Sequence, residues 1–221
     1  MISFNELQEG VYDPNILKAF FLAGGPGSGK SYVVRQTTGG LGMKIVNSDN
    51  AFEKFLKDAN LSLKMPDEEK YARDPVRAKA KNITQKQKSN YVEGRLGLII
   101  DGTGKNYAKI SDEATRLKQL GYDVHMIFVN TSLDTALERN KRRSRSVPES
   151  LVIKSWKDVQ SNIGKFSQYF RQNFVVVDNN DTDEDVMTPV YKQIKSLALA
   201  KISNPVGKQW VANELAKKKR K

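Results

Sequence analysis

Residues 18–38 read KAFFLAGGPGSGKSYVVRQTT, and this stretch decides the fold class. Its first six residues are almost wholly apolar, which is typical of a strand that is buried on both faces. The next eight, GGPGSGKS, match the pattern G-x-x-x-x-G-K-[ST], and the residues from Ser31 onward can begin a helix. A glycine-rich turn could match by chance, but the order of strand, loop and helix favours a phosphate-binding loop.

This loop is expected to bind the phosphates of ATP. Its glycines let backbone N–H groups surround the phosphates, and the start of the following helix adds positive potential. Lys30 is expected to reach the β- and γ-phosphates, and Ser31 to ligand Mg²⁺. The predicted nucleotide-binding residues are Gly24, Gly25, Pro26, Gly27, Ser28, Gly29, Lys30 and Ser31.

Apolar runs alternate with helical patterns along the rest of the chain. Further strands are predicted at residues 43–47, 96–100, 124–129 and 174–177. A helix is predicted from Ile110 to Leu120, with Gly121 as its C-terminal cap. This alternation is typical of strands joined by crossover helices. We therefore expect an α/β P-loop NTPase domain of kinase-like three-layer type, with a five-stranded parallel sheet, helices on both faces and a helical substrate insertion.

Three further helices are predicted towards the C-terminus. Apolar residues recur every three or four positions from Val152 to Phe170, which predicts one continuous helix. Thr188-Pro189 and Asn204-Pro205 each resemble a cap followed by proline at the first helical position. We expect a kinase domain over residues 1–203, followed by a C-terminal helix and basic tail at 204–221.

The interval 57–93 is polar and longer than an ordinary crossover between strands. We expect a small helical insertion there that holds the substrate. Arg77, Lys81 and Lys88 fall near one face of a helix that starts around Pro75. The alternative is a solvated basic face.

Composition narrows the classes of function. The 221 residues include 37 Lys and Arg against 25 Asp and Glu, a formal net charge of +12, which favours an anionic partner such as nucleic acid. The absence of cysteine excludes disulfides and thiol nucleophiles, and the single His125, within an apolar strand, favours a structural role. The sequence shows neither a signal peptide nor a membrane-spanning apolar run, so we expect a soluble, cytoplasmic protein without a membrane partner.

Two carboxylates follow predicted strands. Asp49 comes just after the second strand and Asp101 just after the third, at the sheet edge where ligands of open parallel sheets bind. A carboxylate there can accept the proton of an attacking hydroxyl or hold Mg²⁺. The alternatives are a helix cap for Asp49 and a turn residue before Gly102 for Asp101.

An arginine-rich segment, ERNKRRSR, covers residues 138–145. We expect residues 139–147 to form a lid, in which Arg139 and Arg143 share a helix face and stabilise charge on a transferring phosphoryl group. Arg145 is expected to contact the substrate. A solvated charge run is the alternative.

These motifs resemble two related groups of P-loop kinases, the zeta toxins and the polynucleotide 5′-kinases, across about residues 18–160. The sequence VNSD ends at Asp49, where both groups place the carboxylate that activates the acceptor hydroxyl. The stretch LIIDGTGK is similar to the zeta-toxin motif of an acidic residue followed by Gly-Thr-Gly and a basic residue. The substrate-binding residues that this resemblance implies are Asp101, Gly102, Thr103 and Gly104. The arginine segment looks closer to the polynucleotide kinases.

The resemblance implies an ATP-dependent, Mg²⁺-dependent kinase that phosphorylates a hydroxyl. In zeta toxins the acceptor is a UDP-linked amino sugar, and in polynucleotide kinases it is the 5′-hydroxyl of DNA or RNA, so the acceptor stays open. An antitoxin partner is implied by the zeta-toxin resemblance alone. The competing hypothesis is an ATP-hydrolysing module that binds nucleic acid without transferring phosphate to a hydroxyl.

Overall fold

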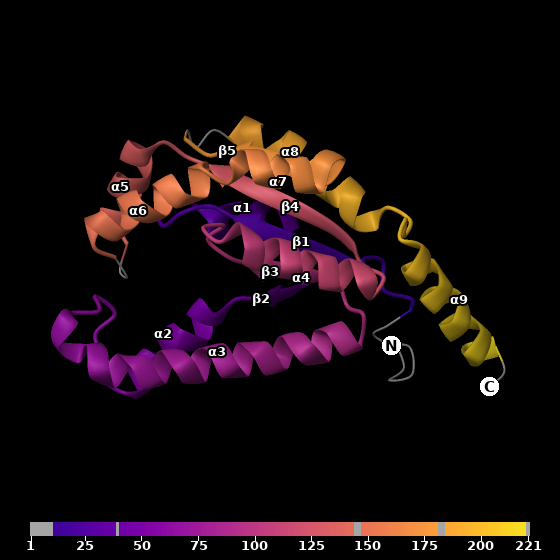
Figure 1. Cartoon of the computed structure of the whole chain (residues 1–221), viewed down its shortest axis with the longest axis horizontal. Helices are drawn as coiled ribbons and strands as arrows, with labels where there is room; N and C mark the ends of the chain where they lie inside the picture. Colours follow the sequence, from indigo (N-terminus) through magenta and orange to yellow (C-terminus); the bar gives the residue numbers. More distant parts are fainter. Residues whose placement is uncertain (1–10, 39, 144–146, 181–183, 220–221) are drawn as a thin grey trace.

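A parallel sheet of five strands forms the centre of the computed structural model (Figure 1). The structure describes residues 11–38, 40–143, 147–180 and 184–219. The strands are β1 (Lys18–Ala23), β2 (Lys44–Val46), β3 (Leu98–Asp101), β4 (Asp123–Asn130) and β5 (Phe174–Asp178). Their order is β2-β3-β1-β4-β5, and every neighbouring pair is parallel. The predicted α/β fold class is thereby confirmed.

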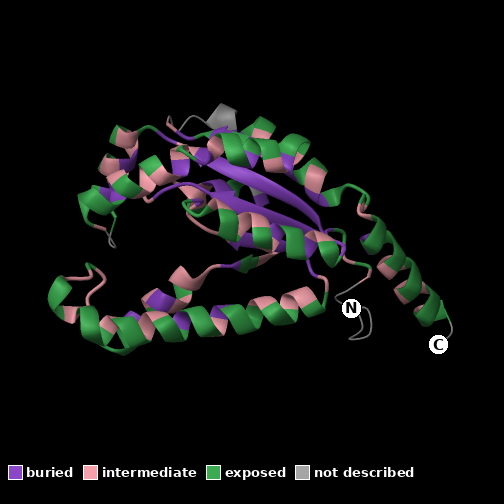
Figure 2. Ribbon diagram, in the orientation of Figure 1, coloured by how far each residue is buried: buried purple, intermediate pink, exposed green. Residues whose placement is uncertain are grey.

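Helices cover both faces of this sheet. On one face, α1 (Lys30–Thr38) and α8 (Glu184–Leu199) pack against Phe20 and Leu22 of β1. On the other face, α4 (Tyr107–Gln119) and α7 (Ile163–Phe170) contribute to the larger hydrophobic cluster. All six residues of β1 are buried, as expected for the central strand of a parallel sheet (Figure 2).

A helical arm, residues 48–93, connects β2 to β3. It consists of α2 (Ser48–Asp58), the short 3₁₀ helix η1 (Asp67–Glu69) and α3 (Lys70–Glu93). The two long helices bury a small apolar cluster of Phe52, Leu56 and Ala80 between them. The predicted insertion is helical, but α3 begins at Lys70 rather than near Pro75. Pro75 lies in the second turn of α3, where it removes one intrahelical hydrogen bond.

The other α-helices of the described residues are α5 (Leu133–Lys141), α6 (Glu149–Gln160) and α9 (Pro205–Lys219). The single helix predicted over 152–170 is wrong, because α6 ends at Gln160 and α7 starts at Ile163. The buried side chain of Asn162, at the break, donates to the carbonyl oxygens of Gly104 and Lys105 over 3.2 and 3.0 Å.

Two prolines near the C-terminus behave differently. The predicted helix start at Thr188-Pro189 is wrong, because α8 begins at Glu184 and accommodates Pro189 in its second turn. The predicted start at Pro205 is confirmed: the Asn204 side chain accepts a hydrogen bond from the Val206 amide over 3.0 Å. Among the described helices, none combines the length and the apolar character needed to cross a membrane.

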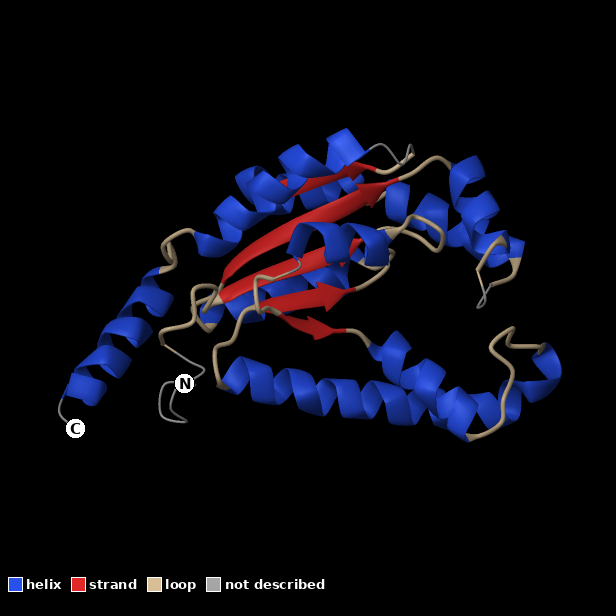
Figure 3. Ribbon diagram, turned by 180° about the vertical axis from the view of Figure 1, so that it is seen from behind, coloured by secondary structure: helices blue, strands red, loops and turns tan. Residues whose placement is uncertain are grey.

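The strands determine where a ligand can bind. Their carboxyl ends all point towards the end of the molecule where α2, α5 and α6 lie (Figures 1 and 3). In open parallel sheets this edge is the usual binding site. The loop between β1 and α1 lies at this edge, at the centre of the sheet.

Candidate active site

The phosphate-binding loop occupies the turn between β1 and α1. Gly27 and Gly29 have φ angles of +80° and +82°, which non-glycine residues rarely adopt. A Cβ atom at Gly27 would lie 2.1 Å from the carbonyl oxygen of Ala136. Glycine is therefore required here both for the backbone angle and for the close approach of α5.

Lys30 begins α1 and lies against this loop. Its Nζ donates to the carbonyl oxygen of Gly24 over 2.6 Å. Burial lowers the pKa of Lys30, while the carboxylates of Asp101 and Asp49 oppose that shift and Arg143 adds to it. The ammonium group thus belongs to one electrostatic cluster with two carboxylates and an arginine.

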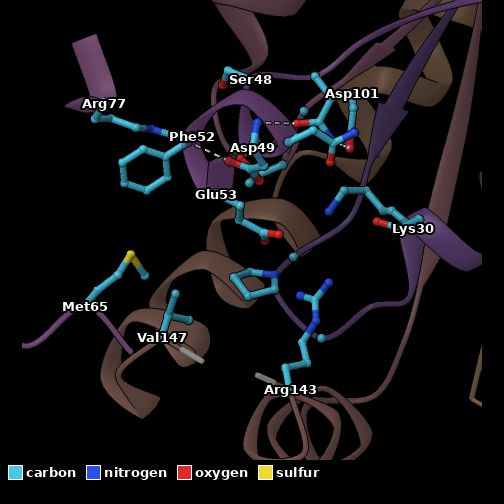
Figure 4. Close-up of a pocket in the computed structure, with 18 of the residues that line it drawn as sticks. Lys30, Ser48, Asp49, Phe52, Glu53, Met65, Arg77, Asp101, Arg143 and Val147 are labelled. Atoms are coloured by element: carbon cyan, nitrogen blue, oxygen red, sulfur yellow. Dashed lines mark hydrogen bonds and ion pairs between the residues drawn. The ribbon is translucent and has the colours of Figure 1, made fainter. Parts of the chain in front are cut away.

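A cavity of about 630 Å³ lies in front of the loop. Lys30, Asp49, Asp101 and Arg143 surround it, with residues of the helical arm on the far side (Figure 4). Its other lining residues are Gly25, Pro26, Gly27, Gly29, Ser31, Asn47, Ser48, Asn50, Phe52, Glu53, Met65, Arg73, Asp74, Arg77, Lys81, Gly102, Thr103, Lys105, Asn140 and Val147. The cavity joins the phosphate loop to the predicted insertion.

Asp49 lies in the first turn of α2, and its side chain is not the helix cap. The cap is Asn47, whose Oδ1 accepts from the Asp49 amide over 2.7 Å. The Asp49 Oδ1 instead accepts from Nη1 of Arg77 on α3 over 2.8 Å. The helical arm therefore orients this carboxylate within the cavity.

Asp101 ends β3 and lies beside the phosphate loop. Its Oδ2 accepts from Nδ2 of Asn47 over 2.7 Å. Burial raises the pKa of Asp101, and the nearby Lys30 ammonium opposes that shift. Asn47 thus connects the two carboxylates, because it caps the helix of Asp49 and binds Asp101 directly.

The turn after Asp101 supports the loop. Gly102 and Thr103 line the cavity, and the carbonyl oxygen of Thr103 accepts from the Gly24 amide over 2.9 Å. Gly104 does not line this cavity. It has a φ of +84°, and a Cβ atom there would lie 2.7 Å from Cβ of Ala23.

The two arginines of the predicted lid, Arg139 and Arg143, lie in different places. Arg143 lines the cavity, whereas Arg139 donates to the carbonyl oxygens of Asn179 and Asn180 over 2.6 and 3.2 Å. They do not share a helix face, because α5 ends at Lys141 and Arg143 lies beyond it. Arg145 lies outside the described residues.

Sequence reasoning missed Asn179, which follows β5. Its side chain is buried, and its Nδ2 donates to the carbonyl oxygen of Ser28 over 2.8 Å. Thr131 Oγ1 donates to the same oxygen over 3.2 Å. Both residues follow directly after apolar strands, so their position at the carboxyl edge was a usable signal in the sequence.

The oxygen donors near the loop fit Mg²⁺. Ser31, Asp49 and Asp101 line one cavity with the phosphate loop. In the described part of the chain, no group of three or more His, Cys, Asp or Glu side chains could hold a metal ion. The Ser31 hydroxyl and the two carboxylates are oxygen ligands of the kind that Mg²⁺ takes, since this ion is usually bound by one or two carboxylates together with substrate phosphates and water.

Comparison with known proteins gives a family match. The sequence model of the Zeta toxin family matches residues 13–188. A search of curated proteins finds no match.

Several solved structures share the fold. A putative kinase from Chloroflexus aurantiacus has a TM-score of 0.53 at 13% identity, covering 82% of this chain and 96% of that one. A chain of the AvrRxo1-ORF1:AvrRxo1-ORF2 complex with sulphate ions has a TM-score of 0.58 at 15% identity, covering 81% of this chain and 64% of that one. A chain of the Pnkp1/Rnl/Hen1 RNA repair complex has a TM-score of 0.53 at 18% identity, covering 74% of this chain and 49% of that one. At these identities the likeness concerns the fold.

Proposed function

The chain belongs to the zeta toxin family and is a P-loop phosphotransferase, and from this premise we propose that it transfers the γ-phosphoryl group of ATP to a hydroxyl of a nucleotide-type acceptor. The observation that carries the proposal is the convergence of the phosphate loop, Asp49 and Asp101 on one cavity. A kinase needs a donor site and an acceptor site that share a boundary, and this cavity extends from the loop to the helical arm.

The donor side of the cavity holds ATP in this proposal. The loop amides and Lys30 bind the phosphates, and Ser31 with Asp101 would hold Mg²⁺. The metal ion, when bound, neutralises negative charge on the phosphates. Arg143 lies across the cavity from the two carboxylates and stabilises charge on the transferring group.

On the acceptor side, Asp49 orients the hydroxyl and accepts its proton. The acceptor oxygen forms a bond to the γ-phosphorus, the bond between that phosphorus and the bridging oxygen breaks, and ADP leaves with the electron pair. Arg77 keeps the Asp49 carboxylate in place through its 2.8 Å hydrogen bond. Two acceptors fit the family resemblance, a UDP-linked amino sugar and a polynucleotide 5′-hydroxyl. Membership of the family also supports an antitoxin protein as a partner.

A phosphate-transfer assay tests this function. The protein is incubated with γ-labelled ATP and Mg²⁺, and 5′-hydroxyl DNA, 5′-hydroxyl RNA, nucleosides and UDP-linked amino sugars are offered in parallel. Label on an acceptor, lost in Lys30→Ala, supports the kinase. Label found as free phosphate alone, released faster with nucleic acid, overturns it in favour of an ATP-hydrolysing nucleic-acid-binding module.

A further inference from the structure

A second cavity, of about 640 Å³, lies between α3 and α4. We call it the α3–α4 groove. It shares Arg77, Lys81, Asp101 and Lys105 with the main cavity, so the two adjoin at the end of β3. A molecule at Asp49 could therefore extend into it.

The groove is strongly basic. Five cations line it, Arg77, Lys81, Lys88, Lys105 and Lys109, against the two carboxylates of Asp101 and Glu113, so five minus two leaves a formal charge of +3. Lys88 pairs with Glu113 inside the groove. The other three lysines are exposed at its rim. Cations gathered around a concave surface raise the local concentration of anions.

The start of α4 adds to this positive potential. The helix opens at the groove, where Asn106 caps it by accepting from the Lys109 amide over 3.0 Å. Its first turn contains no acidic residue, and Lys105 and Lys109 flank the cap. Helix N-termini favour negative charge, so lysines at this position are electrostatically unfavourable until an anion binds.

Arg77 joins the groove to Asp49. Its guanidinium lies 4.7 Å from the centre of the Phe52 ring while Nη1 donates to Asp49 (Figure 4). Guanidinium has five N–H donors in a planar fork, which suits a phosphate as well as a carboxylate. An anion in the groove would therefore share Arg77 with Asp49.

We propose that the α3–α4 groove binds a phosphate group of the acceptor, held by Lys81, Lys105 and Lys109, and that Arg77 couples this binding to the position of Asp49. The inference rests on the proposed function and adds a recognition site to it. It predicts that acceptors are selected by a phosphate remote from the reacting hydroxyl. That phosphate belongs either to a nucleotide or to a nucleic-acid backbone.

Direct binding tests the groove without any turnover. The protein is saturated with a non-hydrolysable ATP analogue and Mg²⁺, which fills the phosphate loop, and is titrated with inorganic pyrophosphate in a calorimeter. Replacing Lys81, Lys105 and Lys109 together by alanine should weaken pyrophosphate binding by about tenfold or more. A matched triple variant at the exposed Lys86, Lys157 and Lys192 should bind as the wild type does. Equal affinity in both variants, or no binding to the wild type, overturns the proposal.

The source of the phosphate follows from the same titration. Uridine diphosphate and a single-stranded 5′-hydroxyl oligonucleotide replace pyrophosphate in two further arms. If the alanine variant of Lys81, Lys105 and Lys109 loses more affinity for uridine diphosphate, the phosphate belongs to a nucleotide. If it loses more affinity for the oligonucleotide, the phosphate belongs to a nucleic-acid backbone.

Arg77 is tested by comparing acceptors. Arg77→Gln should raise the KM for a phosphate-bearing acceptor by about tenfold and change the KM for a plain nucleoside much less. A merely structural role would affect both acceptors alike, and that result contradicts the coupling. A different result would refute the proposed function but support the anion site: the wild-type protein transfers phosphate to none of the acceptors, yet binds pyrophosphate in a way that depends on the three lysines.

Discussion

The side-chain nitrogen of Asn179 donates to the carbonyl oxygen of Ser28 over 2.8 Å, and so ties the end of β5 to the phosphate loop. The backbone carbonyl of Asn179 in turn accepts from Arg139 over 2.6 Å. A Cβ atom at Gly29 would lie 2.2 Å from the Asn179 Nδ2, so this side chain fits closely beneath the loop. The loop conformation therefore depends on residues about 150 positions further along the chain.

Asn179→Ala should weaken ATP binding. Removing one buried hydrogen bond costs about 1–2 kcal/mol, and part of that cost falls on the loop, so we expect the Kd for ATP to rise by about fivefold to tenfold. A fluorescent ATP analogue measures this directly. Asn213→Ala, on the exposed surface of α9, is the matched control. Unchanged ATP affinity in Asn179→Ala would show that the contact does not shape the loop.

The two arginines of the predicted lid should give different defects. Arg143 lines the cavity, so Arg143→Ala is expected to lower kcat by roughly a hundredfold with little change in the KM for ATP. Arg139 binds backbone carbonyls beneath the loop, so Arg139→Ala should raise the KM for ATP and lower the thermal midpoint. Steady-state kinetics, with ATP and the acceptor varied in turn, distinguishes the two defects. Identical kinetic defects in both variants would restore the idea of one shared lid.

His125 should make the stability of the protein sensitive to mild acid. The ring is buried, stacks on Phe20 at 4.7 Å between ring centres, and does not line the cavity. Burial and, to a smaller extent, the Lys18 ammonium lower the pKa of His125 to about 4, against the opposing effect of the Asp123 carboxylate.

The sign of the effect follows from proton uptake. Between the ordinary histidine pKa and the value in the folded protein, the unfolded chain binds the proton and the folded chain does not. Stability is therefore complete at neutral pH and falls as pH decreases, by about 2 kcal/mol near pH 5. Urea unfolding near pH 7.5 and near pH 5 measures this loss, and His125→Leu should remove most of it. An unaltered pH dependence in His125→Leu would assign the loss to other groups.

Much of the fold is predictable from local sequence, because the strands are short apolar runs and the phosphate loop has a rigid pattern. The strand 18–23 coincides with β1, and the start of α9 at Pro205 follows from its cap. The break between α6 and α7 is not predictable from periodicity. The apolar spacing continues through Asn162, and the contacts that its side chain makes at the break, with the carbonyl oxygens of Gly104 and Lys105, lie far away in the sequence.

The candidate site, like the fold, is only partly predictable from the sequence. Lys30 can be proposed from the phosphate-loop pattern, and Asp49 and Asp101 from their positions at the carboxyl ends of strands. The partners that hold them cannot, since Arg77 meets Asp49 from 28 residues away and depends on how α2 and α3 pack. The separate positions of Arg139 and Arg143 likewise depend on where α5 ends.

The most direct test of the account concerns the Asp49 carboxylate. Asp49→Asn keeps an oxygen that can accept from Arg77 but removes the capacity to take up a proton. In a single-turnover experiment with γ-labelled ATP and a saturating acceptor, we expect transfer to fall by at least about a hundredfold while ATP affinity stays unchanged. Transfer at the wild-type rate in Asp49→Asn would contradict the assignment of Asp49 as the base and, with it, the proposed reaction at this cavity.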